Sequence, residues 1–171
     1  MRIRRRFLSL VSGCIVALSV TAVPSAQAES KEYVALGASF SAGSGVPSPV
    51  AGAPAGCGRS TNNFPRLVAR EMGFDLTDMS CGGARTEHLT SSQLAGQPPQ
   101  FDGLSAGTDL VTFMIGYNDG NVYSGSIADC ARPATGSAEI LPCELRTAGR
   151  YSAAIQATGL AISRALADIR S

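Results

Sequence analysis

The run Leu-Val-Thr-Phe-Met-Ile at residues 110–115 constrains the fold of this chain more than any other segment. It is almost wholly apolar, which is typical of a strand in a parallel sheet that helices cover on both faces. Two further β-prone runs precede it, at residues 33–36 and 74–79, and glycine or serine directly follows all three runs. We therefore expect three strands, each ending in a loop of small residues.

A helix is expected between the first two strands, at residues 63–72. Asn62 or Asn63 can cap its N-terminus, Pro65 suits its first turn, and Gly73 stops it. The loop before this helix, residues 43–58, is too rich in glycine, proline and alanine for regular structure.

A second helix is expected at residues 151–169, where apolar side chains recur at helical spacing: Ile155, Ile162, Leu166 and Ile169. Gly159 lies on the same face and costs about 1 kcal/mol relative to alanine unless close packing requires it. We also expect a helix to follow the second strand, so that strands and helices alternate. This order predicts one α/β domain, a doubly wound parallel sheet in three layers, α/β/α.

The N-terminus has the pattern of a secretory signal peptide. Four arginines flank the start of an apolar run at residues 7–23, and Ala26-Gln27-Ala28 is a small-x-small cleavage site. Residues 1–28 are therefore predicted to be removed, which leaves an exported domain at residues 29–171. Loss of the four arginines changes the formal net charge from +1 to −3.

Other fates of this segment are disfavoured. Serines and a glycine interrupt the apolar run, which is at the short end of what spans a bilayer, so a retained anchor is not expected. Lipidation at Cys14 is disfavoured because the run continues past it to the cleavage site, and residues 4–8 also resemble a twin-arginine signal. Nucleic-acid binding is not indicated, because tryptophan is absent and the basic cluster lies within the signal peptide.

The cysteines beyond Cys14 are even in number, which in an exported protein indicates two disulfides. They are Cys57, Cys81, Cys130 and Cys143, and three pairings are possible. A zinc site is the competing interpretation, but no pair has C-x2-C spacing and the chain has one histidine. We expect neither a metal nor another cofactor.

Ser39 is a candidate nucleophile because it lies just after the first strand, at the sheet edge where open α/β folds place their ligands. Ser41 and Ser44 are its competitors, and the G-x-S-x-G elbow of α/β-hydrolases is absent because position 41 is serine. Residues 80–86 and 116–119 follow the other two strands and are expected at the same edge. Taken singly, each of these segments has an ordinary explanation as a turn.

Together, the three segments resemble the SGNH/GDSL hydrolases, and in particular the secreted lipases and esterases of that family. The matching sequences are Tyr-Val-Ala-Leu-Gly-Ala-Ser-Phe-Ser-Ala-Gly, Cys-Gly-Arg-Ser, Ser-Cys-Gly-Gly-Ala and Ile-Gly-Tyr-Asn-Asp. The resemblance extends from Tyr33 to the C-terminus. It implies a flavodoxin-like sheet and a secreted serine esterase that acts on lipid or other acyl esters through an acyl-enzyme.

The resemblance also implies a role for individual residues. Ser39 matches the nucleophile, and the N–H groups of Ser39 and Gly83 and the side-chain amide of Asn118 match the donors of the oxyanion hole. Such a donor is worth roughly 3–4 kcal/mol, because it stabilises the charge that develops on the ester carbonyl oxygen. The implied disulfides are Cys57–Cys81 and Cys130–Cys143.

Two departures from the family pattern bear on activity. Ala38 stands where the family has aspartate, which puts the geometry of the loop in question. The family's last block, Asp-x-x-His, lies beyond two further strands and supplies the general base, and residues 1–171 contain no counterpart of it. We therefore expect the chain to correspond to the N-terminal two thirds of the domain and to lack the last strands.

Three further expectations concern the activity of the chain, its self-association and its only histidine. The esterase is impaired or, alternatively, the chain is a non-catalytic secreted binding or remnant domain. The third strand becomes an exposed apolar edge that invites self-association. His88, the only histidine, is interpreted as an exposed residue on the first turn of the helix after the second strand, without a special role.

Overall fold

The fold is known from a computed structural model that describes residues 30–132 and 142–171. The predicted signal peptide at residues 1–28, with Cys14, lies outside these residues. The strands are β1 (Glu32–Gly37), β2 (Asp75–Asp78) and β3 (Thr108–Met114). The α-helices are α1 (Ser39–Ala42), α2 (Phe64–Met72), α3 (Val122–Ala131), α4 (Cys143–Arg146) and α5 (Ser152–Arg170). The 3-10 turns are η1 (Ala55–Cys57), η2 (Thr86–Leu89), η3 (Gln100–Gly103) and η4 (Asp119–Asn121).

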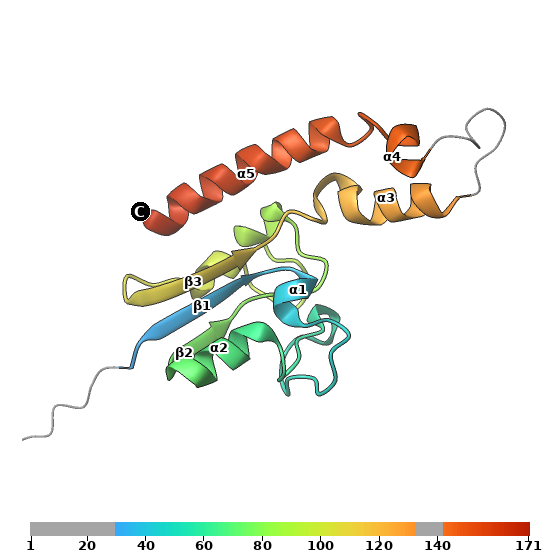
Figure 1. Cartoon of the computed structure of the whole chain (residues 1–171). Coiled ribbons are helices and arrows are strands. Elements are labelled where there is room, and N and C mark those ends of the chain that lie inside the picture. Colours follow the sequence, from blue (N-terminus) through green and yellow to red (C-terminus); the bar gives the residue numbers. More distant parts are fainter. Residues whose placement is uncertain (1–29, 133–141) are drawn as a thin grey trace, which may run out of the picture.

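The three strands form one parallel sheet in the order β2-β1-β3 (Figure 1). Tyr33 of the central strand lies opposite Leu76 on one side and Leu110 on the other. Because all strands run in the same direction, their carboxyl ends meet at one edge of the sheet. Strand order reverses between β1 and β3, and such a switch point is where open α/β sheets bind ligands.

Helices cover both faces of the sheet, which confirms the predicted layered α/β fold. On one face, Tyr33 and Ala35 pack with Ala69 of α2. On the other face, Ile115 packs with Ala165 of α5, and Phe113 and Ile162 lie against this cluster. The two helices accordingly lie on opposite sides of the sheet in Figure 1. Among residues 30–132 and 142–171, no helix is both long enough and apolar enough to cross a membrane.

The helix α2 begins and ends as its sequence predicts. The Asn63 side chain accepts a hydrogen bond from the backbone N–H of Arg66 at 3.1 Å, which caps the N-terminus. Pro65 lies in the first turn, where its missing N–H costs no helical hydrogen bond. Gly73 ends the helix at φ 68°, a left-handed conformation that glycine adopts without strain.

The prediction of a helix between the second and third strands is wrong. Two short 3-10 turns, η2 and η3, occur there instead. Gly96, Pro98 and Pro99 interrupt the segment between them, and proline in particular cannot continue a helix. The connection therefore runs over the carboxyl edge of the sheet as a loop and brings buried glutamines to that edge.

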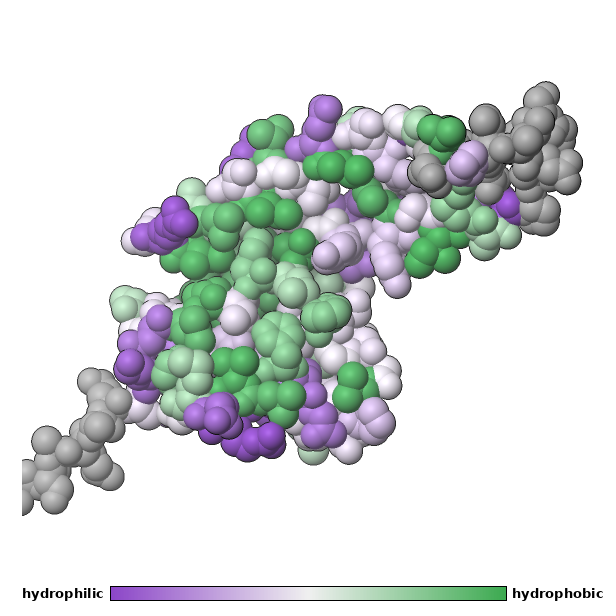
Figure 2. Space-filling model, viewed as in Figure 1, coloured by the Kyte–Doolittle hydropathy of each residue, from purple (hydrophilic) through white to green (hydrophobic). Residues whose placement is uncertain are grey.

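Strand β3 is less buried than its apolar sequence predicts. Residues Leu110 to Met114 are all partly exposed, and β3 pairs only with β1 among the described residues. A cavity of about 480 Å³ lies between β3 and α5, and its lining includes Phe113, Ile155 and Ile162. Figure 2 shows hydrophobic residues gathered between α5 and the sheet on this face.

The α3–α4–α5 region is held together by one disulfide and one acidic side chain. Cys130 and Cys143 form a disulfide between α3 and α4. Asp129 of α3 accepts a hydrogen bond from the Tyr151 hydroxyl at 2.7 Å and pairs with Arg150 at 2.5 Å. These partners, Tyr151 first, hold the pKa of Asp129 below its ordinary value.

Replacing Gly159 with alanine is expected to stabilise the protein by about 0.5–1 kcal/mol. Gly159 lies inside α5, and a Cβ built there meets nothing within 4 Å. The gain is therefore that of helix propensity alone, and urea denaturation measures it. Gly73→Ala is the matched control, because that site also offers open space but has φ +68°. It should destabilise; stabilisation by both variants would contradict this account.

Candidate active site

Ser39 is the first residue of α1 and follows β1 after a single intervening residue, Ala38. The N–H of Ala38 donates to the Met114 carbonyl at 3.0 Å, which ties this loop to the end of β3. Ser39 is exposed, and as the first residue of a helix its N–H has no intrahelical acceptor. Both the hydroxyl and the N–H of this residue are therefore available for chemistry.

The structure separates the three candidate serines. Ser41 is completely buried, and its hydroxyl donates to the Leu36 carbonyl at 3.3 Å, so it cannot reach a substrate. Ser44 is exposed and lines the same cavity as Ser39. Ser39 and Ser44 thus remain as accessible hydroxyls at this edge.

A cavity of about 360 Å³ lies at the carboxyl ends of β1 and β3. Its lining consists of Ala38, Ser39, Phe40, Ser44, Met114, Tyr117, Asn118 and Tyr123. Two of the predicted site residues, Ser39 and Asn118, therefore share one cavity. Gly83 and His88 are not among its lining residues. The cavity wall is mainly apolar and aromatic, with a few polar groups, as is usual for small-molecule sites.

Gly83 lies in the turn that follows β2. Its φ of +76° is a left-handed conformation, which explains why glycine is found there. Two contacts hold the preceding residue: the Gly82 N–H donates to the Cys57 carbonyl at 2.8 Å, and the Gln93 side chain donates to the Gly82 carbonyl at 2.7 Å. The disulfide Cys57–Cys81 attaches the same turn to the long loop after α1.

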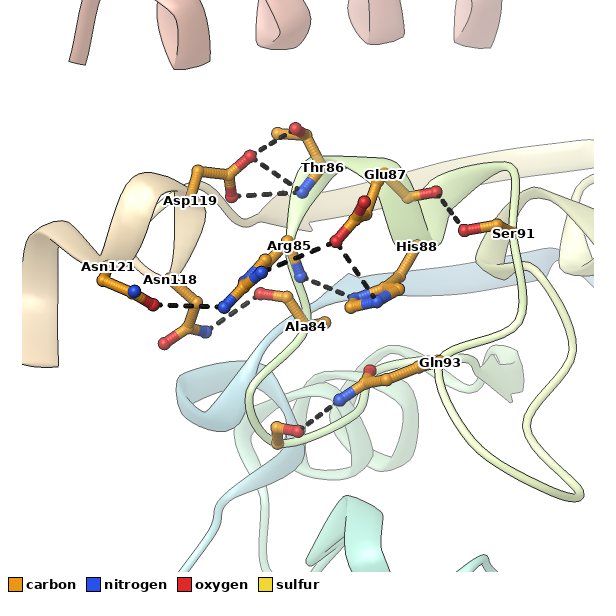
Figure 3. Close-up of polar contacts among 11 residues, drawn as sticks. Ala84, Arg85, Thr86, Glu87, His88, Ser91, Gln93, Asn118, Asp119 and Asn121 are labelled. Carbon is orange, nitrogen blue, oxygen red and sulfur yellow. Dashed lines mark hydrogen bonds and ion pairs between the residues drawn. The ribbon is translucent and has the colours of Figure 1, made fainter. Parts of the chain in front are cut away.

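Asn118 joins the loop after β3 to the loop after β2. Its side-chain amide donates to the Ala84 carbonyl at 2.9 Å (Figure 3). The neighbouring Asp119 accepts hydrogen bonds from the backbone N–H of Thr86 at 3.1 and 3.2 Å and from the Thr86 hydroxyl. An amide nitrogen carries two N–H donors, so the contact with Ala84 leaves one for another acceptor.

His88 differs from the expectation of an exposed residue on an α-helix. It lies on the 3-10 turn η2, and 17% of its side chain is exposed. Its Nδ1 accepts the backbone N–H of Arg85 at 2.9 Å, and its Nε2 lies 3.7 Å from a Glu87 carboxylate oxygen. Figure 3 shows the ring turned toward these neighbours on its own turn. His88 therefore caps η2, and its Nδ1 lone pair is already occupied.

Gln100 and Gln97 support the site from within and were not identified from the sequence. The side chains of Gln97 and Gln100 are almost completely buried. The Gln100 amide accepts from the Gly37 N–H at 2.7 Å and donates to the Gly37 carbonyl at 3.0 Å. The Gln97 amide donates to the Met79 carbonyl at 3.0 Å. Glutamine amides thus take over backbone hydrogen bonds where β1 and β2 end.

A buried carboxylate connects α2 with the loop after β2. Asp78 accepts from the Asn63 amide at 2.8 Å and from the Ser80 hydroxyl and N–H. Arg59 lies nearby and donates to the Ser80 carbonyl at 2.6 Å and to the Gln97 side chain. Burial lowers the pKa of Arg59 below its ordinary value, and the Asp78 charge opposes this shift.

Within residues 30–132 and 142–171, no three histidine, cysteine, aspartate or glutamate side chains are placed to hold a metal ion. The chemical groups at this edge are a hydroxyl, an amide and backbone N–H donors. Such groups suit a reaction that proceeds through a serine adduct and an oxyanion.

Comparison with protein families gives one match that covers most of the chain. Residues 35–170 match the model of the GDSL-like lipase/acylhydrolase family. The matched range includes the cavity at Ser39 and all four paired cysteines. Its boundaries also agree with the extent of the α/β fold, from β1 to the end of α5.

The related proteins with similar sequences are lipases of Streptomyces. Lipase 2 of Streptomyces coelicolor is 41% identical over 157 residues, which are 88% of this chain and 51% of the lipase. Lipase 1 of the same organism is 36% identical over 126 residues, or 72% of this chain and 43% of that protein. The chain thus spans about half the length of the curated relatives that it matches.

Solved structures resemble the fold. The extracellular lipase of Streptomyces rimosus superposes with a TM-score of 0.65 and 28% identity, covering 82% of this chain and 54% of that one. The phospholipase A1 of Streptomyces albidoflavus gives a TM-score of 0.52 and 28% identity, covering 70% of this chain and 45% of that one.

Proposed function

Because the chain belongs to the GDSL-like lipase/acylhydrolase family, we propose that it provides the nucleophile and oxyanion hole of a serine ester hydrolase. Ser39 is the nucleophile, and the N–H groups of Ser39 and Gly83 and the amide of Asn118 stabilise the oxyanion. The observation that carries this proposal is the shared cavity, which brings Ser39 and Asn118 together from the ends of two adjacent strands.

The proposed reaction has two displacements. The Ser39 oxygen attacks the ester carbonyl carbon while its proton passes to a general base, and the carbonyl oxygen becomes an oxyanion held by the donors. The tetrahedral adduct then expels the alcohol, which takes up the proton and leaves an acyl-serine. Water attacks this ester in the same way, releasing the carboxylic acid and restoring the serine.

The general base is the part that the described residues do not provide. The lining of the cavity contains no histidine, aspartate or glutamate. His88 caps η2 through Nδ1. We therefore propose that the 171-residue chain is an impaired esterase unless a separate segment or chain contributes a base.

The substrate is proposed to be an acyl ester or a lipid. Phe40, Met114, Tyr117 and Tyr123 give the cavity an apolar and aromatic wall that suits a hydrocarbon chain. The proteins with similar sequences are lipases, and one structural neighbour is a phospholipase A1, which supports this class of substrate.

Export is proposed on the basis of the sequence and the disulfides. Disulfides persist in oxidising compartments, and this chain has two of them, Cys57–Cys81 and Cys130–Cys143. The Streptomyces rimosus neighbour is an extracellular lipase. Cleavage after Ala28 would release the domain from residue 29 onward.

A non-catalytic binding domain is the second candidate function. It is favoured by the same cavity lining, which offers a nucleophile and oxyanion donors but no base. The partly exposed strand β3 would in either case provide an edge for self-association. The two candidates differ in whether Ser39 reacts covalently.

Covalent labelling with a fluorophosphonate tests this assignment. In a chain completed with an Asp-x-x-His segment, we expect one equivalent of label on Ser39, and Ser39→Ala should abolish it. Ser44→Ala is the matched control, because Ser44 lines the same cavity and its variant should retain labelling. Peptide mass spectrometry locates the adduct. Labelling that survives Ser39→Ala unchanged would show that another serine is the nucleophile.

A further inference from the structure

Asp119 makes the most extensive contact between the two loops that carry the proposed oxyanion donors, and the reaction above does not use it. We propose that Asp119 and Thr86 form an inter-loop clamp that positions the Asn118 amide for the oxyanion. This inference rests on the proposed function, because it assigns Asp119 a positioning role in the same site. The effect of the clamp on the Asn118 amide can nevertheless be tested without measuring turnover.

The clamp consists of three hydrogen bonds to one carboxylate group. Both Asp119 oxygens accept the Thr86 N–H, at 3.2 and 3.1 Å, and one of them also accepts the Thr86 hydroxyl. Hydrogen bonds to an ionised carboxylate are roughly twice as strong as those between neutral groups. Thr86 begins η2, so its N–H belongs to the helical donors that lack an intrahelical acceptor.

Asp119 is adjacent to Asn118 in a turn that has little freedom to adjust. Gly120 and Asn121 both adopt left-handed conformations, with φ of 55° and 56°. A left-handed conformation is unfavourable for a residue other than glycine and persists when surrounding contacts hold it. One such contact is the hydrogen bond that the Arg85 guanidinium donates to the Asn121 side chain at 3.1 Å, which is drawn in Figure 3.

The helix α5 closes the turn from the other side. A Cβ built at Gly120 would lie 2.4 Å from the Ala154 Cβ of α5, so helix and turn are in close contact. The turn is therefore fixed between α5 and the loop after β2. Because Asn118 and Asp119 are neighbours in it, the position of the Asp119 carboxylate and that of the Asn118 amide are coupled.

The Asn118 amide is oriented by the same loop that the clamp holds. One of its N–H groups donates to the Ala84 carbonyl, two residues before Thr86. Fixing Thr86 relative to Asp119 therefore also fixes Ala84 relative to Asn118, and Ala84 directly follows Gly83. An oxyanion hole depends on such fixed donors, because reorganisation during the reaction would cancel part of their effect.

The first experiment measures the orientation of the Asn118 amide in the 171-residue chain. In a ¹⁵N-labelled sample, we expect the amide proton that binds Ala84 to exchange slowly with solvent. Asp119→Ala and Thr86→Val should speed this exchange by about tenfold or more, as expected when a local contact opens. Thr86→Ser keeps the hydroxyl and should retain the wild-type rate. Asp102→Ala, an exposed acidic residue on η3, is the control.

The second experiment measures catalysis in a chain completed with an Asp-x-x-His segment. We expect Asp119→Ala to lower kcat by about 10–100-fold and to change KM by less than about threefold, since the donor acts mainly in the transition state. Asp119→Asn, which keeps the shape, should have a smaller effect. In an Asn118→Ala background, Asp119→Ala should lower kcat by less than about a further threefold, because both changes disable the same donor.

The outcomes separate the clamp from the proposed function. Unchanged exchange of the Asn118 amide in both Asp119→Ala and Thr86→Val would overturn the clamp. Fully additive effects of Asp119→Ala and Asn118→Ala on kcat would overturn the positioning role, because Asp119 would then act independently of Asn118. An inactive completed chain with intact Ser39 would contradict the esterase proposal, while the exchange measurement would still decide whether the clamp exists.

Discussion

A chain completed with an Asp-x-x-His segment should hydrolyse a short-chain p-nitrophenyl ester at least about 100-fold faster than the 171-residue chain, because loss of a triad member costs several orders of magnitude in kcat. Among the described residues, no histidine or carboxylate lines the cavity at Ser39 and could accept its proton. The short chain should still exceed the uncatalysed rate, since the proposed oxyanion donors and substrate binding do not depend on the base. Initial rates at matched protein concentration give the comparison.

Two variants make this test specific. In the completed chain, replacing the added histidine with alanine should return the rate to that of the short chain. In the short chain, His88→Ala should leave the residual rate unchanged, because Nδ1 of His88 is occupied by the Arg85 N–H. Turnover by the short chain within about tenfold of the completed one would contradict the need for an added base. A fall in that turnover on His88→Ala would identify His88 as the base.

Gly37→Ala is expected to destabilise the protein by about 3–5 kcal/mol or to prevent folding. Gly37 ends β1 with φ +146°, and a Cβ there would lie 2.4 Å from both the Met114 carbonyl oxygen and the Ser41 hydroxyl oxygen. The Met114 contact is with backbone, which cannot move without breaking the sheet. Gly37 is also the residue that the Gln100 amide binds.

Gly45→Ala provides the comparison that isolates the steric term. Gly45 has φ +87°, but a Cβ at that position meets nothing within 4 Å. It should therefore cost only the conformational strain, about 1–2 kcal/mol. Urea denaturation of both variants gives the two free energies of unfolding. A cost for Gly37→Ala no larger than that for Gly45→Ala would mean that the loop after β1 can shift to admit a side chain.

The elements that the sequence predicted are those with local signals. The strands at residues 33–36, 74–79 and 110–115 and the helices at residues 63–72 and 151–169 are all present, with boundaries that differ by up to two residues. The start of α2 depends on Asn63 and its end on Gly73, and both act within one helical turn. Such features need no knowledge of the rest of the fold.

The parts that could not be predicted depend on contacts between distant residues. Gln100 binds Gly37 across 63 positions, and Asp119 binds Thr86 across 33. Nothing in the local sequence of either side chain indicates its partner. The glutamines flank Pro98 and Pro99, which indicate only a break in regular structure. These polar residues become significant once the fold brings the strand ends together.

The burial of β3 illustrates a different limit. An apolar run predicts that a strand is buried, but the run itself does not indicate which element covers it. Likewise, the sequence indicates no role for His88, because its role as a hydrogen-bond acceptor requires the geometry of η2. The Arg85 N–H reaches its ring only because the 3-10 turn brings residues three apart together.

The central position of β1 has a consequence for the order of folding. The strand that leads to Ser39 is the first to be synthesised, yet both of its neighbours lie later in the chain, and β3 ends only at Met114. Its pairing with β3 has a large separation in sequence, and contacts of this kind slow folding. A growing polypeptide can therefore pair β1 with β2 once residue 78 has been made, but it must hold the segment that carries Ser39 without its β3 partner until residue 114 has been made. Assembly of the pocket is thus a late event that the whole length up to β3 controls.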